Sequence, residues 1–139
     1  MIKKLASYVK EYKKYAILTP IFVILEVVME VIIPLLMAKI IDVGIQNNDI
    51  KYILEIGALL IVSAIMSLIF GMLSGKFAAK ASAGYSKNLR KAMFHKIQDY
   101  SFENIDKFST SSLVTRMTTD VTNVQMAFQM IIRILVRGP

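Results

Sequence analysis

The chain has 139 residues, of which 55% are hydrophobic and none is cysteine, and its formal net charge is +7. The mean hydropathy of +0.55 lies well above that of ordinary soluble domains. Without cysteine, disulfide frameworks, thiolate catalysis and cysteine metal sites are excluded. Two long apolar stretches account for the hydropathy, and each is long enough to span a bilayer. The composition therefore predicts an all-α membrane protein that crosses the bilayer more than once.

Residues 1–14 combine helical apolar spacing with a basic charge. Leu5, Val9 and Tyr12 recur at helical intervals, with lysines elsewhere in the segment. This pattern predicts an interfacial elbow helix that lies on the membrane surface before the first span. A disordered basic tail is the alternative.

The first predicted span covers residues 15–41. It contains Pro20 and Pro34, each of which removes one backbone hydrogen bond and kinks a helix unless neighbours compensate. Glu26 and Glu30 lie four residues apart and so share one helix face. A carboxylate at the middle of a bilayer costs roughly 2.5 kcal/mol or more, so this face is expected to line a bundle interior or a wet cavity. The pair is either a substrate or proton site, or is satisfied by polar groups on helices elsewhere.

A short loop over residues 42–49 makes the next helix antiparallel to the first, with Asn48 or Asp49 as its N-cap. This second helix, residues 49–100, contains no proline and no turn cluster, and it is apolar at first and then basic. About 50 residues make a rod of ~75 Å, of which the hydrocarbon core needs only ~30 Å. Roughly 40 Å of helix is therefore expected to extend into water, as a lever between a membrane site and a cytoplasmic partner would.

A ladder of small residues at intervals of four runs along the second helix. Small residues let another helix approach closely and pack by van der Waals contact. A strict period of four drifts around a helix of 3.6 residues per turn, so successive positions are expected to meet different neighbours. The positions predicted to pack are Ser67, Gly71, Gly75 and Ala79.

The second helix is predicted to break over residues 101–108, where serine flanks a short segment with apolar side chains. Serine side chains accept hydrogen bonds from free backbone N–H groups at helix ends, so the flanking serine is consistent with one short helix in this segment. Its apolar side chains would lie about 40 Å below the membrane, where a partner buries them unless the segment is a tight turn packed on its own flanking helices. The residues of this short helix are Phe102, Glu103, Asn104, Ile105, Asp106 and Lys107. A third helix is expected over residues 112–139.

The basic residues are unevenly placed along the chain. They gather before the first span and in the second half of the second helix, whereas the loop between the spans is neutral. The positive-inside rule therefore places the N-terminus and the helical extension in the cytoplasm. Anionic lipid headgroups explain the net charge, and nothing interleaves the bases with aromatics as a nucleic-acid surface requires.

Three segments carry a family likeness: residues 34–45 (PLLMAKIIDVGI), 108–125 (FSTSSLVTRMTTDVTNVQ) and 132–139 (IRILVRGP). They resemble the end of the first span, the start of the third helix and the approach to the third span in ABC exporters of the type-1 transmembrane-domain class. The chain looks most like multidrug-type bacterial half-transporters, and the likeness covers essentially all of it. Gly138 is a departure, since alanine is expected there in close relatives.

The resemblance implies a six-helix domain in the bacterial plasma membrane that works as a dimer with a second half-transporter, homo- or heterodimeric. Residues 1–139 would be the N-terminal part of a longer chain, and residues 101–108 would be the first coupling helix, which docks on nucleotide-binding domains. ATP and Mg²⁺ are implied for the full-length transporter. The fragment itself is expected to hold no cofactor, metal or catalytic residue.

The predicted function is the membrane-spanning part of an ATP-driven exporter for multidrug or lipid-like amphiphiles, coupling ATP binding to alternating access. Glu26 and Glu30 are the candidate substrate-pathway residues, and a carboxylate face would suit cationic amphiphiles. The alternative is a two-span membrane signalling protein with a helical cytoplasmic stalk, which the apolar third segment disfavours. No catalytic motif is recognised, and His95 stands alone on a charged helix as an ordinary solvated side chain.

Overall fold

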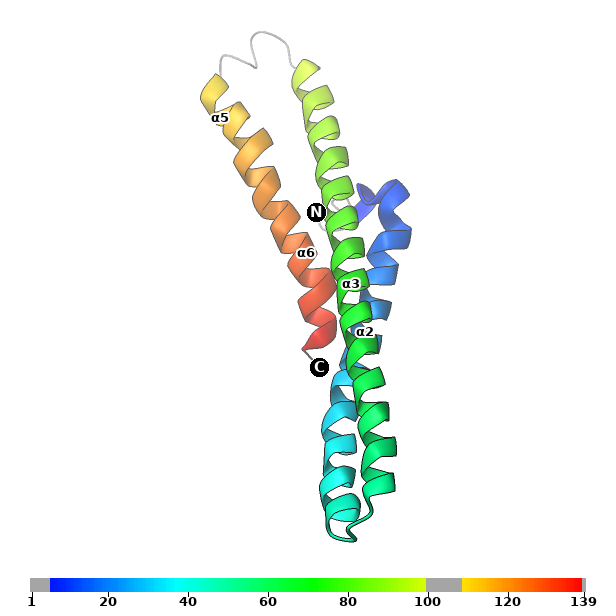
Figure 1. Ribbon diagram of the computed structural model, residues 1–139. Helices are drawn as coiled ribbons and strands as arrows, with labels where there is room; N and C mark the ends of the chain where they lie inside the picture. The colour runs from blue at the N-terminus through cyan, green and yellow to red at the C-terminus, as the bar shows by residue number, and fades with distance from the viewer. Residues whose placement is uncertain (1–5, 100–108, 139) are drawn as a thin grey trace.

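The computed structural model describes residues 6–99 and 109–138, and within these ranges every regular element is helical (Figure 1). Two long antiparallel helices form a hairpin, and a third long helix returns alongside the second. The elements are η1 Lys10–Tyr12, α2 Lys13–Lys39, η2 Ile40–Ile45, α3 Ile50–Gln98, α5 Thr110–Thr115, η3 Arg116–Asp120 and α6 Val121–Arg137. Here η1 is a 3₁₀ helix, and η2 and η3 are π-helical turns. The predicted all-α fold is confirmed.

The first long helix runs from α2 into η2 with both prolines inside α2. With η1 it forms an apolar helical stretch, Lys10–Ile45, that is long enough to cross a membrane. Thr19, just before Pro20, is fully buried, and its hydroxyl donates to the Tyr15 carbonyl oxygen at 2.9 Å. This bond to the preceding turn satisfies the hydroxyl without a partner from another helix.

The turn between the two long helices is tight. Asn48 has a left-handed backbone with φ of 51°, and the Asp49 carboxylate accepts the backbone N–H of Tyr52 at 3.1 Å. Of the two predicted N-caps, the structure therefore uses Asp49.

α3 is one unbroken helix of 49 residues, or ~73 Å at the usual rise. The absence of proline predicts this rod, and the structure ends it at Gln98. In its apolar half, large side chains such as Leu54, Ile61 and Leu68 are exposed. A continuous apolar surface of this kind needs a bilayer or another chain to cover it.

Aromatic rings hold α2 and α3 together along the hairpin. Phe22 lies between Phe70 and Phe77, with ring centroids 6.1 and 5.4 Å apart. Tyr15 stacks on Phe77 at 5.8 Å. Such tilted and offset ring pairs are favoured by the charge distribution of the rings, so they help to fix the register of the two helices.

The third helix begins at Thr110, two residues before the predicted start at residue 112. The cause is Ser109, whose hydroxyl accepts the backbone N–H of Ser112 at 3.2 Å and caps the helix. From there α5, η3 and α6 follow one another directly to Arg137. Figure 1 shows α5 standing apart from α3, while α6 converges on it.

A small core lies in the basic half of α3, where the N-terminal segment and α6 meet it. Val9, Tyr85, Leu89 and Val121 are buried there, and Phe128 stacks on Tyr85 at a centroid distance of 4.7 Å. The basic half of α3 is therefore stabilised by apolar packing within the protein, and not by the bilayer alone.

The described part of the N-terminal segment packs on α3. Val9 belongs to the core, and the Asn88 side-chain amide donates to the Tyr8 carbonyl oxygen at 2.9 Å. Lys10 has a φ of 35° and separates a first helical turn from the remainder of the segment. The interfacial helix predicted over residues 1–14 reaches outside the described residues and stays a prediction.

Replacing Gly84 with alanine is expected to destabilise the protein by about 1–3 kcal/mol. Gly84 is buried, and a Cβ atom there would overlap the Tyr12 ring, so the N-terminal segment would have to move. Gly57→Ala is the matched control, because a Cβ atom at Gly57 would meet nothing within 4 Å. Thermal unfolding of the purified full-length protein measures both variants, and equal losses would contradict the close approach of Tyr12.

Candidate functional site

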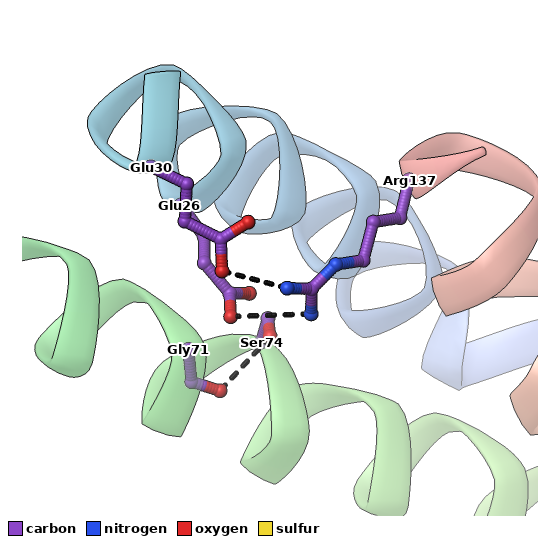
Figure 2. Close-up of polar contacts among 5 residues, drawn as sticks. All are labelled: Glu26, Glu30, Gly71, Ser74 and Arg137. Carbon is purple, nitrogen blue, oxygen red and sulfur yellow. Dashed lines mark hydrogen bonds and ion pairs between the residues drawn. The ribbon is translucent and has the colours of Figure 1, made fainter. Parts of the chain in front are cut away.

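Glu26 and Glu30 of α2 both point toward Arg137 at the end of α6 (Figure 2). Nη2 of Arg137 donates to Oε1 of Glu30 at 2.6 Å, and Nη1 lies 3.6 Å from Oε1 of Glu26. The spacing of four residues puts both carboxylates on one face of α2, so a single guanidinium group reaches both.

The two carboxylates differ in burial. The Glu26 side chain is 13% exposed, whereas Glu30 is 42% and Arg137 is 48% exposed. Oε2 of Glu26 is buried and has no hydrogen-bond partner among the described residues. Burying a charged carboxylate costs free energy unless the charge is paired. The stability of the protein therefore depends more on the longer contact of Arg137, to Glu26, than on its contact to Glu30.

Gly71 of α3 provides the space that Glu26 occupies. A Cβ atom on Gly71 would lie 3.0 Å from Oε1 of Glu26 and 3.2 Å from its Cδ. One turn further on, Ser74 is fully buried, but its hydroxyl donates to the Gly71 carbonyl oxygen at 2.9 Å (Figure 2). α3 therefore contributes a small-residue surface here, and the compensating charge comes from α6.

A cavity of about 330 Å³ opens beside this ion pair, between α2 and α6. Its lining is Val23, Glu26, Met126, Gln129, Met130, Arg133, Ile134 and Arg137. Apolar walls with a few converging polar groups are typical of sites for small molecules. Methionine side chains adapt to guests of different shape, because they are unbranched and polarizable.

Arg137 is the residue of this candidate site that the sequence prediction misses. Arg133 and Arg137 lie four residues apart on α6, the same spacing as the two glutamates on α2. These matched pairs are the signal that could have found the contact. Arg133 lines the same cavity, and within the described part of the chain it makes no ion pair.

The four predicted packing positions on α3 differ in burial and in the residues that they meet. Gly71 meets Glu26, Ser67 is half-buried, Ala79 is exposed, and Gly75 has open space around it. The buried small residues of α3 do not follow the predicted ladder, and most of them gather between residues 74 and 86. They are Ser63, Ser74, Ala78, Ala81, Ser82, Gly84 and Ser86. Packing at Gly75 and Ala79 stays a prediction for a helix elsewhere.

The predicted coupling residues, 102–107, lie outside the described residues, so their docking on a nucleotide-binding domain stays a prediction. His95 is exposed on α3, with its ring centroid 6.5 Å from that of Phe94.

Residues 16–139 match the family described as the ABC transporter transmembrane region. The chain belongs to this family: it is a membrane protein and forms the transmembrane part of an ABC transporter. The resemblance drawn from the sequence is confirmed at this level. The alternative of a two-span signalling protein does not agree with this assignment.

Relatives with curated sequences agree with the family. The chain is 38% identical over 138 residues to the uncharacterized ABC transporter ATP-binding protein YfiB of Bacillus subtilis, covering 99% of this chain and 24% of the relative. It is 23% identical over its full length to an uncharacterized ABC transporter ATP-binding protein of Mycobacterium tuberculosis, again 24% of that protein. An ATP-dependent lipid A-core flippase of Pseudoalteromonas translucida is 27% identical, over 97% of this chain and 23% of the flippase. The chain thus spans about a quarter of the length of these relatives.

Proposed function

We propose that this chain forms the first part of the transmembrane domain of an ATP-driven exporter of amphiphiles in a bacterial plasma membrane. The observation that carries the proposal is the cavity between α2 and α6, which joins apolar walls to charged groups at the middle of the first span. An amphiphile combines the same two parts: its apolar body would contact the apolar walls, and its polar head would contact the ion pair.

The long α3 helix supplies the mechanical part of the proposal. Its apolar half would cross the membrane, and its basic half would extend into the cytoplasm together with the N-terminus. Nucleotide-binding domains and a second half-transporter would be the partners. Closure of those domains on ATP and Mg²⁺ would move the rigid extension, and packed helices respond to such a push by changing between discrete arrangements.

The charged side chains that line the cavity bear on which class of amphiphile is the substrate. Glu26 lines the cavity together with Arg133 and Arg137, so the cavity does not carry the purely acidic face that the sequence suggests. A cationic head would compete with Arg137 for the carboxylates. Lipid-like amphiphiles are the second class, and the lipid A-core flippases among the relatives support it.

Glu26→Gln is expected to raise the concentration of a cationic amphiphile that half-maximally stimulates ATP hydrolysis by about tenfold, as for the loss of one charge-assisted hydrogen bond. The measurement uses the full-length protein in nanodiscs. Glu55→Gln, at an exposed position outside the cavity, is the matched control and is expected to change nothing.

The outcomes separate the site from the function. If Glu26→Gln responds to every amphiphile as the wild type does, the cavity is not the substrate site, although an exporter could remain. If the wild-type protein in sealed vesicles moves no amphiphile when ATP is added, the exporter proposal itself is wrong.

A further inference from the structure

The basic half of α3 carries a lysine stripe, formed by Lys76, Lys80, Lys87 and Lys91. Their intervals of four, seven and four residues return to the same face of a helix. All four are exposed. From residue 76 to residue 98 the sequence contains no aspartate or glutamate, so the helix does not neutralise the stripe itself.

A groove of about 450 Å³ lies between the lysine stripe and the start of α2. Its described lining is Tyr12, Tyr15, Lys80, Ala83, Gly84 and Lys87. The small residues at positions 83 and 84 interrupt the lysines, and the Tyr12 ring lies against Gly84. The lining of the groove therefore combines two tyrosine rings from the start of the first long helix with two lysine side chains from α3.

The groove lies at the level where both long helices change from apolar to charged. Tyr15 begins the apolar stretch of α2 and stacks on Phe77 of α3 at 5.8 Å. Nζ of Lys80 lies 5.2 Å from the centroid of the Tyr15 ring. Tyrosine and lysine side chains at such a boundary are typical of the headgroup layer, where the rings are half immersed and the ammonium groups reach the phosphates.

The surrounding charge favours an anionic guest. Residues 1–25 contain one acidic residue, Glu11, which is exposed. The same segment contains Lys3, Lys4, Lys10, Lys13 and Lys14. The net field at this end of the hairpin is therefore positive, and it attracts anionic lipids more strongly than zwitterionic ones.

We propose that this groove binds the phosphate headgroup of an anionic phospholipid, with Lys80 and Lys87 on the phosphate and Tyr12 and Tyr15 along the glycerol backbone. The acyl chains would continue over the exposed apolar surface toward Ile17, which is 62% exposed. This continuity with the span favours a lipid over a soluble anion. The inference rests on the proposed function in one respect, the assignment of this end of the hairpin to the cytoplasmic leaflet.

The test measures lipid association with the full-length protein in phosphatidylcholine nanodiscs that contain spin-labelled phosphatidylglycerol. The wild-type protein is expected to prefer this lipid over spin-labelled phosphatidylcholine. Lys80→Gln/Lys87→Gln is expected to lower the preference by an order of magnitude or more, since each lysine near a membrane surface contributes roughly a fivefold effect. Lys91→Gln/Lys96→Gln removes the same charge from the basic half of α3 outside the groove and is expected to leave the preference unchanged.

Three results would overturn the proposal. Equal losses in the two double variants would mean that the effect is the general field of the protein. No loss in either would mean that the groove holds no headgroup. Release of the labelled lipid by millimolar inorganic phosphate would assign the groove to a soluble anion. The measurement needs no ATP, so a protein that transports an amphiphile but shows no lipid preference overturns this inference alone.

Discussion

Arg137→Gln is expected to lower the free energy of unfolding by roughly 3–5 kcal/mol, the usual cost of leaving a buried charge without its partner. The charge in question is that of Glu26, which is 13% exposed and has one oxygen without any hydrogen-bond partner in the described structure. Gly71 packs against this carboxylate without offering it a side-chain donor. The loss is measured as a shift of thermal unfolding of the full-length protein in nanodiscs.

Two second-site variants identify which carboxylate is responsible. Glu26→Gln in the Arg137→Gln background is expected to restore most of the stability, because it removes the buried charge. Glu30→Gln in the same background is expected to restore little, because Glu30 is 42% exposed and needs its partner less. The opposite order would show that the shorter contact, at 2.6 Å, is the dominant one and that the burial argument is wrong.

The parts of the fold that the sequence predicts are those fixed by local chemistry. Residues 49–100 contain no proline, and α3 is unbroken from Ile50 to Gln98. Asp49 has the side chain of an N-cap and acts as one. The spacing of Glu26 and Glu30 requires a common face, and the structure has both on one guanidinium group. Each of these depends on neighbours within a few residues along the chain.

The parts that the sequence does not predict depend on which helices meet. Arg137 is 107 residues from Glu30, and the matching spacing of the two charged pairs does not by itself say that α2 and α6 meet. The predicted ladder and the buried small residues lie on different faces of α3, since Ser74 and Ala78 are fully buried while Ala79 is exposed. Val9 has the spacing of a membrane-facing residue, yet it lies in a protein core, because α3 passes beside it.

Tyr85→Ala is expected to destabilise the protein by roughly 3–5 kcal/mol, as for other buried aromatic residues. Tyr85 is 3% exposed and stacks on Phe128 of α6 at 4.7 Å with an interplanar angle of 16°. It also packs with Val9 and Val121, so its removal loosens the N-terminal segment and α6 together. On the proposed function, this core transmits movement of the extension to α6, and amphiphile-stimulated ATP hydrolysis is expected to fall as well.

Two controls distinguish the packing role of Tyr85 from other causes. Phe94→Ala removes an exposed ring from the same helix and is expected to cost less than 1 kcal/mol, since little burial is lost. Tyr85→Phe keeps the stacked ring. Burial, together with the neighbouring Tyr8, raises the pKa of Tyr85, so the hydroxyl is neutral at pH 7 and its removal deletes no charge. Tyr85→Phe is therefore expected to unfold close to the wild-type temperature. A loss as large as that of Tyr85→Ala would place the stabilising contact at the hydroxyl and not in the ring stack.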